Sequence, residues 1–212
     1  MIECYSAGTV NGQRVVCMLE ETGLDYSPHW VDIRGGEHRS PEFLALNPRG
    51  RIPVIVDPNG PEGKRFILNQ SSIIVLYLAD KTGMFLPRSG PRRYLCMQWL
   101  SFVITDFAPA AIALFFLREQ DQHSVDIFRG RTDQFMIDAD KQLASNEFLA
   151  GNEISVADIC LYPSLLVSQA AQIVEGTPEL KHLRRWRDTM AARPGIKRGI
   201  AACPSPDLLK RS

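Results

Sequence analysis

The sequence lacks closely spaced cysteines. Its five cysteines are odd in number and far apart, and they form neither a C-x-x-C pair nor the spacing of metal ligands. The four histidines, His29, His38, His123 and His182, are equally dispersed. We therefore expect reduced thiols in the protein core and no bound metal.

The sequence also lacks a net charge and a long apolar run. Lys plus Arg and Asp plus Glu each total 24, so no strong field attracts nucleic acid or an anionic membrane. Apolar runs such as residues 112–117 are shorter than a membrane span. The N-terminus, MIECYS, has no basic segment followed by an apolar core. We expect a cytoplasmic protein that binds small molecules, with no nucleic acid and no membrane.

Hydrophobic periodicity in the first third of the chain alternates between strand and helix patterns. The predicted strands span residues 2–5, 29–33, 52–56 and 65–68, and the predicted helices span residues 14–22, 41–46 and 71–81. The turn sequence DPNGPEG lies between the last two strands and predicts that they pair antiparallel.

After residue 83 the strand patterns stop. The segment MFLPRSGP, residues 84–91, contains two prolines and a glycine and predicts a linker. Helical patterns follow, the first with a bend at Pro109, and they span residues 92–117, 126–143, 155–174 and 178–192. We expect an α/β domain over residues 1–83 and an all-helical domain over residues 92–212.

The polar loop YSAGTVNG, residues 5–12, joins a predicted strand to a predicted helix. The free N–H groups and the positive dipole end of a helix start favour anion binding. Thr9 and Asn11 add side-chain donors, and Ser6 is a second hydroxyl at the strand end. Thr9 also has a structural interpretation, because threonine is a common N-cap residue.

The dipeptide Ile52-Pro53 stands where a strand is predicted to begin, although proline cannot donate to a strand ladder. A cis bond would turn the Ile52 N–H and C=O outward, where they can pair with an extended peptide. A trans proline that opens an edge strand is the alternative, and the frequency of trans bonds favours it.

The dipeptide Gln70-Ser71 opens a predicted helix. Ser71 and the first helical N–H groups are able to bind a carboxylate, and the Gln70 carbonyl can accept from an ammonium group. Simple N-capping by Ser71 is the alternative. Arg51 and His38 offer donors for a second carboxylate, or are solvated surface residues.

These motifs occur in one order that resembles the cytosolic glutathione transferases. The resemblance rests on GRIPV and QSSII, the proline-containing linker, SVADI and the final WRDTMAARPG. SAGTVNGQRV, LEETGLDY and YLADKTGMFLP are most similar to the bacterial nu class. The resemblance implies a thioredoxin-like α/β N-terminal domain followed by an all-α C-terminal domain, the glutathione transferase fold.

The resemblance also implies roles for the residues at these motifs. Thr9 and Asn11 would stabilise the thiolate of bound glutathione, which is a co-substrate. Ile52 and Pro53 would hold its cysteinyl backbone, Gln70 and Ser71 its γ-glutamyl end, and Arg51 with His38 its glycyl carboxylate. The thiolate would attack a small hydrophobic electrophile or a disulfide, and the protein would be a homodimer.

Two features depart from the family pattern. The nu-class loop reads Thr-Pro-Asn, and this chain has Val10 in place of the proline. At the position of Gln70 the family often has glutamate. The first departure keeps open an alternative function, a non-catalytic binding protein with the same fold.

Overall fold

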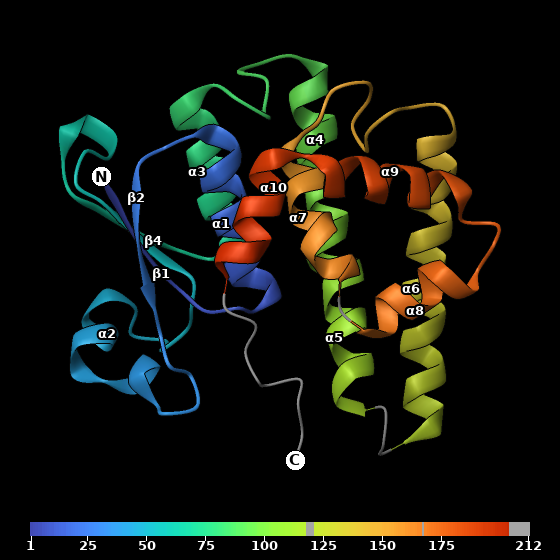
Figure 1. Ribbon diagram of the computed structural model, residues 1–212, viewed down its shortest axis with the longest axis horizontal. Helices are drawn as coiled ribbons and strands as arrows, with labels where there is room; N and C mark the ends of the chain where they lie inside the picture. The colour runs from blue at the N-terminus through green and yellow to red at the C-terminus, as the bar shows by residue number, and fades with distance from the viewer. Residues whose placement is uncertain (118–120, 167, 204–212) are drawn as a thin grey trace. The chain divides into compact units, whose positions relative to one another are not determined.

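A four-stranded mixed sheet, with strand order β2-β1-β3-β4, organises the first part of the protein (Figure 1). In this computed structural model, which describes residues 1–117, 121–166 and 168–203, β1 (Ile2–Ser6) pairs parallel with β2 (Tyr26–Trp30). On its other side β1 pairs antiparallel with β3 (Val54–Asp57), which pairs antiparallel with β4 (Phe66–Asn69). The predicted hairpin is therefore confirmed.

The second strand begins three residues before its predicted start. The prediction of a strand at 29–33 is wrong because β2 is an exposed edge strand, so its residues lack a buried alternating face. Pro28 is tolerated there because an edge strand leaves one side unpaired. The Val31 N–H still donates to the Ser6 carbonyl at 2.8 Å, just beyond the strand end.

The helices of this part cover both faces of the sheet. Ile2, Cys4 and Ser6 are the buried residues of β1. The two long helices are α1 (Val10–Thr22) and α3 (Ser71–Thr82), with α10 (Pro194–Ala202) packed on α1. A cluster of Val31, Phe43 and Val54, with Tyr5 packed against it, places the short helix α2 (Pro41–Leu46) against the other β1 face.

Helix α10 was not predicted, because Pro194-Gly195 resembles a helix stop. Instead Pro194 begins the helix, where its missing N–H costs nothing. The Ile196 N–H donates to the Glu21 carboxylate at 3.0 Å, and a Cβ on Gly199 would lie 2.6 Å from the Cα of Cys17. The chain divides into two units, and α10 groups with residues 1–82 instead of with the helical part.

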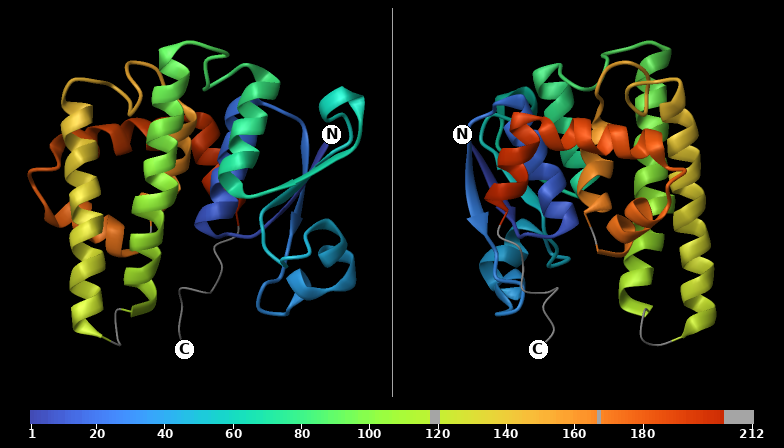
Figure 2. Two further views of the ribbon diagram at one scale, coloured as in Figure 1. Left: turned by 180° about the vertical axis from the view of Figure 1, so that it is seen from behind. Right: turned by 45° about the vertical axis from the view of Figure 1, so that its right-hand side comes forward.

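The second unit, residues 83–193, is helical. It contains α4 (Pro91–Ser101), the π-helical segment η3 (Phe102–Phe107), α5 (Ala108–Leu117), α6 (Gln122–Ala144), α7 (Val156–Leu165), α8 (Ser168–Gly176) and α9 (Lys181–Ala192). Figure 2 shows the continuous run α4–η3–α5 lying alongside α6. Pro109 cannot donate to the carbonyl four residues earlier, and the helix widens into η3 just before it.

The run from Pro91 to Leu117 is long and apolar enough, by length and composition alone, to cross a membrane. Its most apolar 18-residue window has a mean hydropathy of 2.0, and 39% of that window is buried. The sequence analysis considered only unbroken apolar runs, whereas this helix also includes polar residues. Within the unit α4 packs on α7 and α5 packs on α6, so one side of the run is covered by helices of the same unit.

The predicted single helix at 155–174 is two helices. Helix α7 ends at Leu165 and α8 begins at Ser168, and Val167 lies outside the described residues. Pro163 lies inside α7, where it removes one helical hydrogen bond shortly before the helix ends. A capping box begins α7 within the SVADI segment: Ser155 is the N-cap, and the Asp158 carboxylate accepts from the Ser155 N–H at 2.8 Å.

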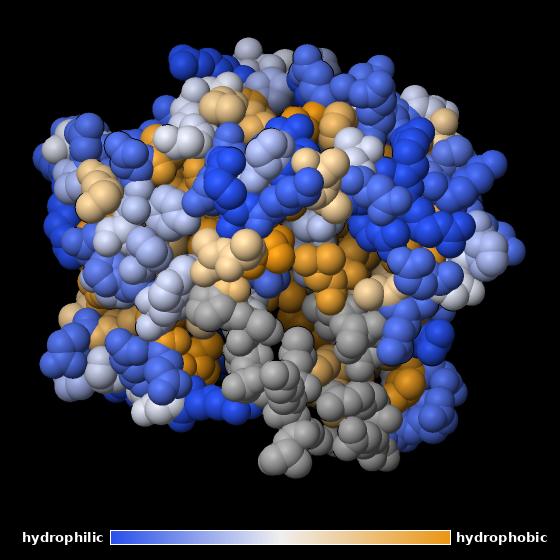
Figure 3. All heavy atoms as spheres, in the orientation of Figure 1, coloured by the Kyte–Doolittle hydropathy of each residue, from blue (hydrophilic) through white to orange (hydrophobic). Residues whose placement is uncertain are grey.

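The basic helix α9 uses its arginines to cap neighbouring helices. Arg184 donates to the carbonyls of Val174 and Thr177, and Arg185 donates to those of Leu143 and Asn146. Hydrophilic side chains gather over this helix in Figure 3. The positive charges therefore satisfy carbonyls near the C-terminal ends of α6 and α8.

All five cysteines are free and buried, as the sequence predicts. Burial raises the pKa of the Cys4 and Cys203 thiols to about 12. Both thiols are consequently protonated at neutral pH and are poor nucleophiles.

Candidate active site

The first component of the site is the start of α1. Thr9 is the N-cap of this helix, and its hydroxyl accepts from the Gly12 N–H at 3.2 Å. A Cβ on Gly12 would lie 2.0 Å from the Ala7 carbonyl oxygen, so only glycine allows the loop to pass this close to the helix. Thr9 is therefore an N-cap, as its structural interpretation predicts. Because the hydroxyl only accepts in this contact, its proton is still available to donate.

The second component is the start of α3. Gln70 has a φ of 73°, a left-handed conformation that costs a non-glycine residue about 1–3 kcal/mol and clusters at functional sites. The Gln70 carbonyl accepts from the Ile74 N–H, so Gln70 occupies the cap position. Ser71 is therefore the first residue of the helix and not its cap, and its hydroxyl donates to Asn11 Oδ1 at 3.2 Å.

The third component is the loop before β3. The Ile52-Pro53 bond is cis, so the trans alternative is wrong. Among the described residues, the Ile52 N–H and C=O form no hydrogen bond. Asn47 shapes this loop from a buried position: its amide donates to the Arg51 carbonyl at 2.6 Å and accepts from the Arg49 N–H at 3.2 Å.

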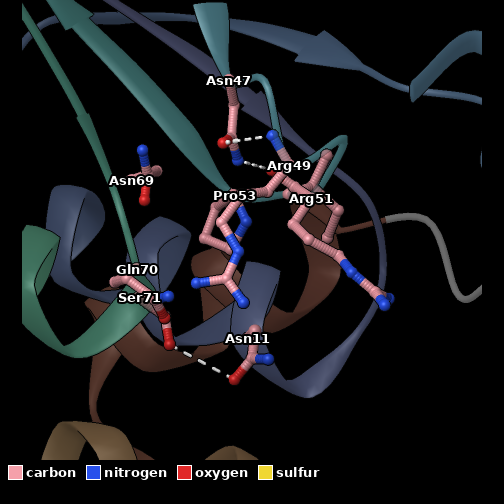
Figure 4. Close-up of a pocket in the computed structure, with 9 residues that line it drawn as sticks. Asn11, Asn47, Arg49, Arg51, Pro53, Asn69, Gln70 and Ser71 are labelled. Carbon is pink, nitrogen blue, oxygen red and sulfur yellow. Dashed lines mark hydrogen bonds between the residues drawn. The ribbon is translucent and has the colours of Figure 1, made fainter. Parts of the chain in front are cut away.

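These three components surround one pocket of about 270 Å³. Its lining residues are Asn11, Asn47, Arg49, Arg51, Ile52, Pro53, Asn69, Gln70 and Ser71. Figure 4 shows Asn11 and Ser71 pointing toward one another, with Pro53 and the two arginine residues coming from the loop before β3. Two lining residues are cationic and none is acidic, so the pocket favours an anion.

Six of the eight predicted site residues line the pocket, namely Asn11, Arg51, Ile52, Pro53, Gln70 and Ser71. Thr9 and His38 are not among the lining residues. Thr9 is two residues from Asn11 in the same helix start. His38 lies in the short helix η1 (Glu37–Arg39), and its Nδ1 is buried without a hydrogen-bond partner among the described residues.

The sequence prediction missed Asn47, Arg49 and Asn69, which also line the pocket. The Asn-Pro-Arg-Gly sequence at 47–50 is a turn signal, and Asn47 acts there through the side-chain-to-backbone bonds typical of asparagine in turns. Nothing in the sequence around Asn69 distinguishes it from other residues at strand ends.

The fold is that of the glutathione S-transferases. Residues 10–81 match the N-terminal domain of the glutathione S-transferases and residues 95–194 match the C-terminal domain, so the chain belongs to this family. The predicted family and fold class are therefore confirmed. The closer placement in the nu class stays a prediction.

Among its relatives are two disulfide-bond oxidoreductases of Escherichia coli (strain K12). YghU is 32% identical over 93% of this chain and 73% of its own length, and YfcG is 31% identical over 94% of each. A glutathione transferase from Pseudomonas putida, crystallised with one glutathione disulfide bound per subunit, has a similar structure. Its TM-score is 0.87 and its identity 32%, over 94% of this chain and 90% of that chain.

Proposed function

We propose that the protein is an enzyme that uses the thiolate of bound glutathione to reduce disulfides or to attack hydrophobic electrophiles. The observation that carries this proposal is the charge of the pocket, which has two arginines and no acidic residue among its described lining residues. Glutathione presents two carboxylates and suits such a site. The two E. coli relatives are named disulfide-bond oxidoreductases, and the P. putida protein binds glutathione disulfide.

We assign the parts of glutathione to residues of this site as the family resemblance implies. Ile52 offers an unpaired backbone edge to the cysteinyl residue of the tripeptide. Gln70 and Ser71, at the start of α3, receive the γ-glutamyl ammonium and carboxylate. Arg51 is assigned to the glycyl carboxylate together with His38, although His38 does not line the pocket, and Arg49 lines it beside Arg51.

The thiol end lies at the start of α1, where Thr9 and Asn11 donate to sulfur. Lowering a thiol pKa from about 8.5 to about 6.5 requires roughly 2.7 kcal/mol of preference for the thiolate. One hydrogen bond to a charged group supplies about 1.5–3 kcal/mol, and a helix N-terminus adds about 0.3–1 kcal/mol. These contributions are sufficient without a protein base, because water accepts the proton.

The disulfide reaction then balances in two exchanges. The bound thiolate attacks one sulfur of the substrate disulfide, a new S–S bond forms, and the second sulfur leaves as a thiolate. A second glutathione thiolate attacks the mixed disulfide, which yields glutathione disulfide and the other substrate thiolate. With an electrophile, a C–S bond forms and the leaving group departs with its electron pair. Buried thiols such as Cys4 take no part.

The experiment that tests this function is a pH titration of the thiolate absorbance of bound glutathione. We expect a bound-thiol pKa clearly below the free value in the wild type. Thr9→Val, which removes the hydroxyl, should raise that pKa by about 1–2, because it deletes one charge-assisted hydrogen bond. Thr9→Ser keeps the hydroxyl and the cap, and should retain the wild-type pKa.

An unshifted pKa in the wild type, or no glutathione binding, would instead favour the non-catalytic binding protein. A shifted pKa that survives Thr9→Val would remove Thr9 from the mechanism and leave the overall function standing.

We also propose that the protein is a homodimer. Large apolar side chains are exposed along the run from Pro91 to Leu117, among them Tyr94 at 71% and Phe116 at 62%. Exposed large apolar side chains on one helical run are a feature of interaction surfaces. Sedimentation velocity should give twice the monomer mass of 23.8 kDa. A species of monomer mass at micromolar concentration would contradict the proposal.

We further propose a cytoplasmic location, supported by the five free and buried cysteines. Cell fractionation tests it, since recovery in the membrane or secreted fraction would rule it out.

A further inference from the structure

Arg14 is a buried arginine beside the candidate site that neither the sequence nor the pocket lining identifies. It lies in α1 and is 2% exposed, although a buried charge is costly unless it is engaged. Its Nη1 donates to Asn11 Oδ1 at 2.8 Å. The two residues are three positions apart in the helix and therefore share a face.

The carbonyl oxygen of Asn11 receives a second donor, the Ser71 hydroxyl, at 3.2 Å. An amide oxygen has two lone pairs, so these two contacts fill it. A flipped amide would place the Nδ2 hydrogens against the Arg14 guanidinium, which is unfavourable because both groups can only donate. The Nδ2 hydrogens are therefore left for the pocket that Asn11 lines.

The two contacts on Asn11 differ in what ligand binding does to them. A carboxylate bound at the start of α3 accepts a hydrogen bond from the Ser71 hydroxyl, since an ionised carboxylate can only accept. The Ser71 contact with Asn11 is then lost. The Arg14 contact, which is shorter and charge-assisted, remains and holds the amide in the occupied site.

We propose that Arg14 is a positioning residue that fixes the Asn11 amide with its NH₂ group facing the pocket, so that one N–H can donate to the sulfur of bound glutathione. This inference rests on the proposed function. Before glutathione binds, the same asparagine oxygen also connects the start of α1 with the start of α3 through Ser71. The positive charge of Arg14 also polarises the amide and makes it a stronger donor.

The test is a double-mutant cycle on the pKa of bound glutathione. Arg14→Gln should raise the bound-thiol pKa by about one unit, which is tenfold in the thiolate equilibrium. Arg14→Lys keeps a charge and a donor and should restore most of the shift. In an Asn11→Ala background, Arg14→Gln should produce no further change, because its effect passes through the amide.

A second readout separates positioning from general damage. The Kd of S-methylglutathione, which has no ionisable thiol, should change less than about threefold in Arg14→Gln. If Arg14→Gln does not fold, Arg14→Met, which retains the apolar stem without the charge, takes its place in the cycle.

Two results would overturn this inference alone. The first is a bound-thiol pKa in Arg14→Gln that is as low as in the wild type. The second is an equal rise of this pKa on Arg14→Gln in the wild-type and Asn11→Ala backgrounds, because Arg14 would then act on the thiolate directly by its charge. If bound glutathione has its free pKa in the wild type, the proposed function fails and this inference fails with it.

Discussion

Asp158→Ala is expected to destabilise the helical unit by at least about 4 kcal/mol. The Asp158 carboxylate is fully buried and accepts four hydrogen bonds. The donors are the Leu149 N–H at 3.0 Å, the Ser155 N–H at 2.8 Å, the Ser155 hydroxyl at 2.7 Å and the Trp186 indole N–H at 2.8 Å. Each buried donor left without an acceptor costs about 1–3 kcal/mol, so their sum approaches the stability of a whole domain.

Urea unfolding followed by tryptophan fluorescence measures this loss, because Trp186 is both buried and a member of the network. Asp126→Ala is the matched control, since Asp126 is exposed and its carboxylate accepts from the Gln122 side chain. The control should change stability by less than about 0.5 kcal/mol. A loss below about 1.5 kcal/mol in Asp158→Ala would show that water or a neighbouring group satisfies these donors.

Elements whose start and stop signals lie within a few residues were predictable. Helix α2 runs over the predicted residues, because Ser40 caps it through the Phe43 N–H at 3.2 Å and Pro41 occupies its first position. The β3–β4 hairpin follows from the DPNGPEG turn. In both cases the sequence signal and the stabilising contact involve the same short segment.

Helix α10 shows why the remaining elements were not predictable. Its first turn is held by Glu21, and its fit depends on the contact between Gly199 and the α1 backbone at Cys17. Both partners are more than 170 positions away along the chain. No local pattern encodes such a contact, so Pro194-Gly195 resembled a stop.

The residues of the site also fall into a group that the sequence predicts and a group that only the structure identifies. Ile52, Gln70 and Ser71 stand at predicted element boundaries, and they line one pocket. Asn47 matters because its side chain reaches the carbonyl of Arg51, and Arg14 because it reaches Asn11. These residues act through another residue, so their own types carry no signal of a site.

Ser71→Ala is expected to weaken glutathione binding by about 10- to 100-fold. Ser71 is 7% exposed at the start of α3, so its hydroxyl is already held where a carboxylate would meet the first helical N–H groups. The hydrogen bond to a charged group that the substitution deletes contributes about 1.5–3 kcal/mol, which corresponds to this range of Kd. Isothermal titration calorimetry with glutathione measures the change.

Ser72→Ala is the control, because Ser72 is the next residue of the same helix and is not among the pocket-lining residues. It should leave the Kd within about twofold of the wild type. Equal losses in the two variants would mean that the helix start was damaged and that Ser71 binds no carboxylate.

The Ser71→Ala variant also distinguishes the role of the α3 start from the role of the α1 start. Arg14 still holds the Asn11 amide when the Ser71 hydroxyl is absent. Once the weaker binding is compensated by excess glutathione, the bound thiol should therefore keep its wild-type pKa. We expect Ser71→Ala to lose affinity with an unchanged thiol pKa, and Arg14→Gln to lose thiolate with an unchanged affinity for S-methylglutathione. This pair of results would assign binding to the start of α3 and thiolate stabilisation to the start of α1.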